Sequence, residues 1–191
     1  YFSMIETTEQ LLEKAALDVC GTADVSVDST TISFRAPFKR ISIYDAIHEH
    51  TGFDVSRMNE EQLRSVCKQL HISVDNTMGK GKLIDELFGG KCEHLYIQPT
   101  FIIDYPVEMS PLTKKHRDKQ GLVERFELII NGKEIANAYS ELNDPIDQRE
   151  RFEEQAQLLE RGDHEAMFID QDFLRALEYG MPPTSGIGFG I

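Results

Sequence analysis

Residues 125–144 read RFELIINGKEIANAYSELND, two runs of strand-forming residues joined at Asn131-Gly132. Asn-Gly between two such runs is the strongest short-range signal for a β-hairpin with a two-residue loop. Acids and amides stand in this hairpin where apolar residues are usual, at Glu127, Glu134, Asn137 and Glu141. Polar groups among strand formers indicate a sheet surface that faces a ligand. We therefore expect the functional site on this hairpin.

The loop length sets the strand register, and the register decides which acids meet. A two-residue loop pairs Ile129 with Glu134 and Glu127 with Ala136. Glu127 and Glu134 then lie on one face as diagonal neighbours, with Cβ atoms about 7–8 Å apart. Mg²⁺ is usually held by one or two carboxylates together with substrate phosphates, so it would suit this pair. Two solvent-exposed strand acids would give the same pattern, and both interpretations stay open.

Asn137, Tyr139 and Glu141 alternate along the second strand and therefore share a face. An amide, a phenol and a carboxylate side by side would suit a polar cationic ligand. Strict alternation places them on the face opposite Glu134. One site can include all of them only if the strand has a β-bulge near Ile135-Ala136, and bulges are common beside active sites. We predict that bulge, and a regular ladder there would contradict it.

The last glycines, Gly186-x-Gly188-x-Gly190, do not match the dinucleotide-binding fingerprint. On a strand, this spacing suggests that a flat ligand approaches bare backbone closely, although a terminal tail would look the same. No Ser-His-Asp or Cys-His arrangement stands out, so covalent catalysis has no evident nucleophile. The residues themselves thus predict a magnesium–phosphate site next to a pocket for a cationic ligand.

Short helices and strands alternate along the rest of the chain. Ser3-x-x-Glu6 has the pattern of a capping box and predicts the start of the first helix. Asp144-Pro145 predicts the start of a long helix, with Asp as the N-cap and Pro at the first helical position. The other predicted elements are strands at 30–34 and 96–104, a helix at about 170–179, and short helices in 42–91, the last of them stopping at Gly89-Gly90. Together they predict an α+β fold, a mainly antiparallel β-sheet flanked by helices, with 42–91 as a small helical insert.

The composition is that of an ordinary globular protein. A chain of 191 residues, 40% of them hydrophobic, can bury the core of one domain. It has no apolar run near the roughly 20 residues that cross a bilayer, and no signal peptide is visible. Three widely spaced cysteines without a Cys-x-x-Cys pair fit a reducing compartment. We therefore expect a cytoplasmic protein without a membrane partner.

The net charge is −13, which argues against non-specific binding of nucleic acid by the body of the chain. The run KKHRDK, residues 114–119, is nevertheless locally basic. It is either a solvated loop or a small contact patch, and the sequence does not distinguish the two.

Several motifs point to a known family. Between Arg125 and Arg149 the chain carries RFEL, GKE-x-x-NAY-x-ELNDP and QR. Elsewhere it carries PTF at 99–101, MSPL at 109–112, AMFID at 166–170, LEYG at 177–180 and PPT at 182–184. By these motifs the chain resembles the class II lysyl-tRNA synthetases, loosely over 1–91 and closely over 95–191. The hairpin motif separates the lysine enzymes of that family from the related aspartate and asparagine enzymes.

The resemblance implies ATP-dependent activation of L-lysine to lysyl-adenylate and its transfer to tRNA(Lys) by a homodimer. It implies that Glu127 and Glu134 hold Mg²⁺ on the ATP phosphates, and no residue is implied as a catalytic acid, base or nucleophile. The residues that would bind ATP are Glu134, Ile135, Gly190 and Ile191. The residues that would bind lysine are Asn137, Tyr139, Glu141 and Gly186. Ile135 would meet the adenine through its backbone, and Glu141 would lie beside the substrate ammonium.

Other parts of that family would lie outside this sequence. Motifs 1 and 2 and the anticodon-binding domain would precede Tyr1, and the Asp-Arg that continues the third motif would follow Ile191. We therefore expect 1–191 to be a partial catalytic domain that is inactive alone. One alternative is a paralogue that lysylates a protein, which would lack the anticodon-binding domain. The other is a non-catalytic binding module with the same fold, which magnesium-dependent ATP binding would exclude.

Overall fold

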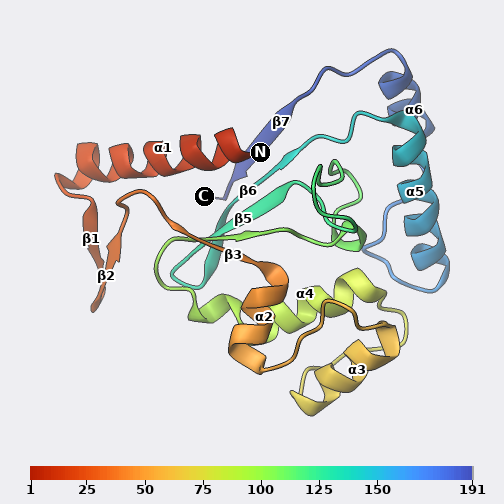
Figure 1. Cartoon of the computed structure of the whole chain (residues 1–191), viewed down its shortest axis with the longest axis horizontal. Helices are drawn as coiled ribbons and strands as arrows, with labels where there is room; N and C mark the ends of the chain where they lie inside the picture. Colours follow the sequence, from red (N-terminus) through yellow and green to blue (C-terminus); the bar gives the residue numbers. More distant parts are fainter. Residues whose placement is uncertain (191) are drawn as a thin grey trace.

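The central element is a five-stranded β-sheet that carries helices on both faces (Figure 1). The structure is a computed structural model, and it describes residues 1–190. The strands follow in the spatial order β3 (Lys39–Ser42), β4 (Thr100–Ile103), β5 (Arg125–Ile130), β6 (Lys133–Ser140) and β7 (Ser185–Phe189). β3 and β4 are parallel, and all other neighbours are antiparallel. The predicted α+β fold with a mainly antiparallel sheet is confirmed.

A helical block connects the two parallel strands β3 and β4. Parallel neighbours need a long crossover connection, and here it consists of α2 (Ile43–Thr51), α3 (Glu60–Gln69), α4 (Lys80–Lys91) and the 3₁₀-helix η1 (Glu93–Leu95). Figure 1 shows α2, α3 and α4 gathered on one side of the sheet. The short helices predicted in 42–91 are confirmed. That this block is an insert in a partial catalytic domain stays a prediction.

Local signals explain where the helices of the block begin. Ser42 accepts a hydrogen bond from the backbone N–H of Asp45 and so caps α2, while a capping box opens α3. The predicted stop of α4 at Gly89-Gly90 is wrong, because the helix runs on to Lys91. Four buried apolar side chains of α4 hold the helix against its neighbours. This packing outweighs the roughly 1 kcal/mol that each helical glycine costs.

Helix α1 (Phe2–Cys20) packs on the opposite face of the sheet and leads into a separate hairpin of β1 (Asp24–Val27) and β2 (Thr30–Ser33). β2 confirms the strand predicted at 30–34. The predicted capping box at Ser3 is wrong, because α1 already begins at Phe2 and no side chain caps it. Ser3 therefore lies inside the first turn, where its side chain cannot act as the N-cap.

Helices α5 (Pro145–Glu160) and α6 (Gln171–Glu178) pack on each other beside the C-terminal strands (Figure 1). Asp144 and Asp170 cap them, and each accepts hydrogen bonds from two backbone N–H groups of the first turn. The predicted helix start at Asp144-Pro145 is confirmed. Within residues 1–190, no helix combines the length and the apolar character needed to cross a membrane.

Neighbouring residues of β5 belong to hydrophobic cores on opposite faces of the sheet. Phe126 and Leu128 pack in the core beneath α1, whereas Ile129 packs with the helical block. Alternate residues of a strand share a face, so Arg125 and Glu127 face the same side as Ile129. The polar side chains of this strand therefore line the face on which the helical block lies.

Candidate functional site

The hairpin of β5 and β6 contains the predicted bulge. Ile129 pairs with Glu134 as predicted, but the next pair is Leu128 with Ala136, so that Ile135 is an extra residue without a partner on β5. The pairing predicted between Glu127 and Ala136 is wrong. The bulge adds one residue to β6 and thereby places Asn137, not Ala136, opposite Glu127.

The bulge brings both glutamates to one amide. The Asn137 Nδ2 atom donates to the Oε1 atoms of Glu127 and Glu134, each at 3.3 Å. The two Oε1 atoms are therefore at most twice that distance apart. Because Tyr139 follows Asn137 by two positions on β6, it shares this face as well. The structure thus unites the two acids with the amide and the phenol that strict alternation would have separated.

Arg125 joins this cluster, although it is not among the site residues predicted from the sequence. Its guanidinium donates to Glu127 Oε1 and, at 3.2 Å, to Asn137 Oδ1. On its far side it donates to the backbone oxygen of Met109 at 3.0 Å and to Ser110 Oγ at 2.9 Å, at the end of the 3₁₀-helix η2 (Val107–Met109). The signal was available, because Arg125 stands two residues before Glu127 on one strand and so shares its face.

Tyr105 is the second residue of the cluster that is not among those predicted from the sequence. Its side chain is 1% exposed, and its hydroxyl donates to Glu127 Oε2 at 2.7 Å. The guanidinium carbon of Arg125 lies 4.6 Å from the centre of the Tyr105 ring, which is the geometry of a cation–π contact. Tyr105 lies in the loop after β4, and no periodic pattern in the sequence indicates that it meets β5.

Burial raises the pKa of the Glu127 carboxyl above its ordinary value, and the nearby charge of Glu134 acts in the same direction. The Arg125 guanidinium and the hydrogen bond from Tyr105 oppose this rise without reversing it. Two neighbouring carboxylates, one largely buried and the other exposed, make a place where a divalent cation would relieve electrostatic repulsion.

Glu127 and Glu134 fit Mg²⁺ only as part of a shared site. Within residues 1–190, no group of three or more His, Cys, Asp or Glu side chains is placed to hold a metal ion. Mg²⁺ commonly takes one or two protein carboxylates and completes its octahedron with substrate phosphates and water. Two converging acids, one of them exposed to solvent, match that donor set and do not match a closed protein cage.

A small cavity of about 170 Å³ opens beside Asn137 and Tyr139, and segment 109–113 and Arg125 form its other walls. Glu141 does not line this cavity but lies next to it, because its backbone forms an isolated β-bridge with Thr113 in the cavity wall. Burial raises the pKa of the Glu141 carboxyl. Within residues 1–190, no Lys or Arg side chain pairs with Glu141, so the carboxylate is available to a cationic group.

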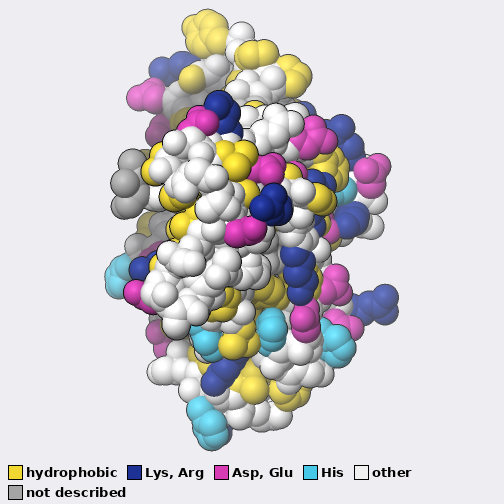
Figure 2. All heavy atoms as spheres, turned by 90° about the vertical axis from the view of Figure 1, so that its left-hand side faces the viewer, with side chains coloured by type: hydrophobic (Ala, Val, Ile, Leu, Met, Phe, Trp, Pro, Cys, Tyr) yellow, Lys and Arg dark blue, Asp and Glu magenta, His cyan; other side chains and the backbone are white. Residues whose placement is uncertain are grey.

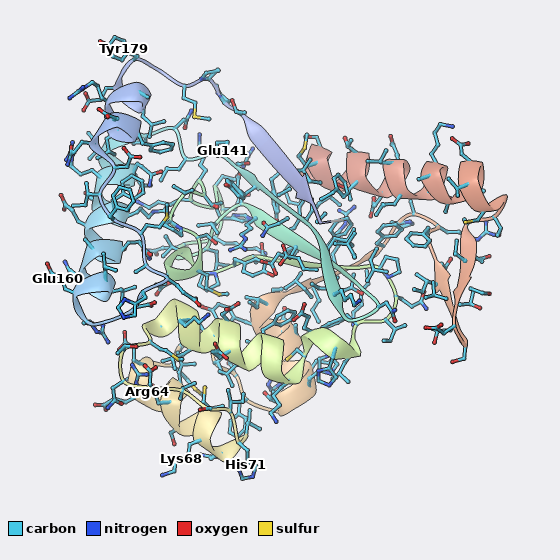
Figure 3. All side chains as sticks on the ribbon, turned by 180° about the vertical axis from the view of Figure 1, so that it is seen from behind. Arg64, Lys68, His71, Glu141, Glu160 and Tyr179 are labelled. Atoms are coloured by element: carbon cyan, nitrogen blue, oxygen red, sulfur yellow. The ribbon has the colours of Figure 1, made fainter. Side chains whose placement is uncertain are left out.

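Gly186 has no Cβ atom, and the space that a side chain would fill there is occupied by the Glu141 carboxylate. Gly186 pairs with Tyr139 across β6 and β7, and a Cβ atom added to it would lie 2.9 Å from Glu141 Oε1, closer than real Cβ contacts come. Figure 3 shows Glu141 at the end of β6 beside β7. The structure therefore brings Tyr139, Glu141 and Gly186 together at one end of these two strands, and Asn137 lies midway along β6, between this group and Glu134.

The residues expected to bind ATP lie at the other end of the same strands. Glu134 is exposed, and the carbonyl of the bulged Ile135 accepts a hydrogen bond from the backbone N–H of Gly190 at 2.9 Å. Glu134, Ile135 and Gly190 are therefore neighbours. Ile191 lies outside the described residues.

A larger cavity of about 550 Å³ adjoins the site at Arg125 and runs between the start of α4 and the end of α5. Ion pairs line it: Lys80 with Glu108 at 2.9 Å, Lys82 with Glu165 at 2.7 Å, and Arg161 with Glu60 at 2.9 Å. Arg125 is paired with Glu127. Within the described chain, the cavity thus presents no unpaired basic side chain to a phosphate.

The basic run at 114–119 is largely neutralised by acids of the fold. Lys115 pairs with Asp147 at 3.0 Å, Arg117 pairs with Glu124 at 2.6 Å, and Lys119 pairs with Asp104. On the face that Figure 2 shows, Lys and Arg side chains lie among Asp and Glu side chains and do not gather in one patch. These pairs favour the interpretation of 114–119 as a loop over that of a small contact patch, and they tie the loop to its neighbours in the fold.

Comparison with known proteins shows that the similarity is not confined to the hairpin but covers the whole chain. A family model of the class II tRNA synthetases (D, K and N) matches residues 1–191. All 191 residues align with a lysine–tRNA ligase of Porphyromonas gingivalis (strain ATCC 33277) at 65% identity and cover 33% of that protein. The lysine–tRNA ligase of Christiangramia forsetii is 64% identical with 34% covered, and that of Azobacteroides pseudotrichonymphae is 62% identical with 38% covered. The chain thus spans about a third of the length of the curated relatives it matches.

Proposed function

Because the chain belongs to the class II tRNA synthetases (D, K and N), we propose that it supplies part of the active site of a lysine–tRNA ligase. This enzyme would activate L-lysine with ATP to lysyl-adenylate and transfer the lysyl group to tRNA(Lys). The observation that carries the proposal is the bulge at Ile135, which unites Glu127, Glu134 and Asn137 on one face. Relatives named lysine–tRNA ligase, 62–65% identical over all of this chain, support the choice of amino acid.

In this proposal Glu127 and Glu134 hold Mg²⁺, which would neutralise charge on the ATP phosphates. Glu134 also contributes to the ATP site together with the backbone of Ile135 and with Gly190. Ile191 is included in that site from the resemblance alone. The bulge supports this assignment because it leaves the backbone of Ile135 outside the regular ladder of β5 and next to Gly190.

Lysine would occupy the small cavity beside Asn137 and Tyr139, with its ammonium near Glu141. Because Gly186 has no side chain, it leaves space for that carboxylate. A half-buried carboxylate without a basic partner within residues 1–190 is a favourable site for a substrate ammonium, because the ion pair forms only when the substrate arrives.

The chemistry would depend on position and charge. No residue of the cluster is placed as a nucleophile, and the amide, acids and glycines instead hold two reactants in a fixed relation. We further propose that tRNA(Lys) and a second copy of the protein are its partners at the relatives' full length, and that 1–191 forms part of the catalytic domain.

The test is amino-acid-dependent exchange of pyrophosphate into ATP, measured on a protein of the relatives' full length that carries this sequence. Lysine should support exchange that depends on Mg²⁺, while aspartate and asparagine should not. Charging of tRNA(Lys) is measured in parallel, together with transfer of labelled lysine to proteins. Exchange with aspartate or asparagine, or label that enters protein and not tRNA, would refute the proposal.

A further inference from the structure

The loop after β4 carries Tyr105 into the core directly below the hairpin. β4 ends at Ile103, and Asp104 has a positive φ of 59°, which turns the chain there. The carbonyl of Tyr105 accepts a hydrogen bond from the Val123 N–H at 2.9 Å, and this fixes the residue to the start of the hairpin. A tyrosine that is 1% exposed needs a partner for its hydroxyl, and the partner here is Glu127.

The two oxygens of Glu127 are held by different donors. Oε1 accepts from Arg125 and Asn137, while Oε2 accepts from the Tyr105 hydroxyl at 2.7 Å. Within residues 1–190, Tyr105 is the one donor to Oε2. Donors on both oxygens fix the plane of the carboxylate. Both lone pairs of Oε1 are used, whereas Oε2 keeps a second lone pair for another ligand.

The ring of Tyr105 is itself held in place by Arg125, whose guanidinium carbon lies 4.6 Å from the ring centre. Arg125 is in turn anchored to the Met109 carbonyl and to Ser110 Oγ. Tyr105 lines neither cavity of the site, so it would act on the proposed substrates only through Glu127.

We propose that Tyr105 is a positioning residue, which orients the Glu127 carboxylate for the magnesium–ATP complex through its hydrogen bond to Oε2. This inference rests on the proposed role of Glu127. The hydroxyl is the part that matters, because a phenylalanine ring could still stack on Arg125 and fill the core.

The first experiment compares Tyr105→Phe with Tyr96→Phe in the full-length protein. Tyr96 is a matched control, because it is 5% exposed and its hydroxyl has no hydrogen-bond partner among the described residues. Calorimetry measures the Kd of magnesium–ATP, and exchange kinetics measure the KM values of ATP and lysine. Tyr105→Phe should weaken magnesium–ATP binding on the order of tenfold, as expected for a hydrogen bond to a charged group, and leave the lysine KM within about twofold. Tyr96→Phe should change neither value.

The second experiment is a double-mutant cycle with Glu127→Gln, because a positioning residue acts only through the group that it positions. Tyr105→Phe should cause no further loss of magnesium–ATP affinity in the Glu127→Gln background. An equal loss in both backgrounds, an effect no larger than that of Tyr96→Phe, or a Tyr105→Phe variant that does not fold would overturn the inference. A wild-type protein without magnesium–ATP binding or lysine-dependent exchange would instead refute the proposed function.

Discussion

The amide of Asn137 has two hydrogens, and one glutamate oxygen lies 3.3 Å from its nitrogen on each side. Its Oδ1 atom accepts from Arg125, so the side chain uses its donor and acceptor ends at once. These three bonds also assign the orientation of the amide, because the flipped rotamer would place oxygen against two carboxylates. One residue thus keeps two like charges close together and carries no charge itself.

Gly186→Ala should impair lysine binding more than it impairs folding. The added Cβ atom would lie 2.9 Å from Glu141 Oε1, the far end of a flexible side chain, so the carboxylate would move and the backbone would stay. We expect the KM of lysine to rise on the order of tenfold or more, with little change in melting temperature. Gly188→Ala on the same strand should have a smaller effect, because the nearest atom is 4.0 Å away. Equal effects of the two variants would contradict the steric explanation.

Glu141→Gln should make the protein more stable at neutral pH, and the gain should disappear in acid. Burial raises the pKa of Glu141 in the folded state. Below the ordinary glutamate value of about 4.3, the carboxyl is protonated in both states, so the two proteins differ little. Between this value and the raised pKa of the folded state, the carboxyl ionises in the unfolded chain but stays protonated in the folded protein. The wild type therefore loses stability as the pH rises through the folded-state pKa. Urea unfolding at pH 4 and pH 7 measures this difference, and a gap that does not widen with pH would contradict it.

The bulge shows how an element can be predicted while its register is not. The polar residues of β6 required an irregularity near Ile135, and the Asn-Gly loop fixed the pair of Ile129 and Glu134. The pairing of Glu127 was nevertheless predicted wrongly, because it was counted along a regular ladder. A bulge shifts every later pair by one residue, and only the bulge's position tells where the shift begins.

Deletion of Ile135 should separate the proposed ATP contacts from the proposed lysine contacts. Removal of this extra residue leaves Glu134 opposite Ile129 and Asn137 opposite Glu127 in a regular ladder, so both side chains keep their face. The hydrogen bond from the Gly190 N–H to the Ile135 carbonyl is lost. We expect the KM of ATP to rise on the order of tenfold while the KM of lysine changes little. A parallel rise of both values in exchange assays would show that the bulge supports the whole site.

Gly81→Ala should destabilise the protein, because α4 packs tightly on η2 at this point. The new Cβ atom would lie 2.5 Å from the backbone oxygen of Glu108, and a backbone atom cannot rotate away. We expect a loss of about 1–3 kcal/mol in the free energy of unfolding, measured by urea denaturation. Gly90→Ala is the control on the same helix, where the nearest atom is Ile72 Cδ1 at 3.6 Å. Gly90→Ala should be neutral or slightly stabilising. An equal loss of stability in both variants would mean that the substitutions disturb α4 itself and not its contact with Glu108.

The helical block faces the end of α5 and the segment after it across the cavity of about 550 Å³, where two ion pairs link them. Long-range contacts of this kind could not be predicted from the sequence, because Lys82 and Glu165 are far apart in the chain and belong to different elements. The same holds for Tyr105 and Glu127. The fold class, most helix starts and the acids of the hairpin were predictable, since they depend on local patterns. The residues that support those acids depend on packing.

Removal of both links, by Lys82→Ala together with Arg161→Ala, should loosen the end of α5 without unfolding the molecule. The side chain of Glu165 is 74% exposed, so solvent weakens its pair with Lys82. The melting temperature should change little. Backbone amides of residues 158–166 should exchange hydrogen faster, measured by mass spectrometry, while those of β5 and β6 stay as they are. Faster exchange throughout the sheet would mean that the two links hold the fold together.

Both oxygens of Glu127 are hydrogen-bonded before any ligand is present. A free glutamate gives up about 1.5–2 kcal/mol of side-chain conformational entropy when it is fixed. At Glu127 this entropy is lost when the chain folds, so a ligand that binds later does not have to order the side chain again. Binding at this carboxylate should therefore be opposed by a smaller entropy change than binding at an exposed glutamate such as Glu134.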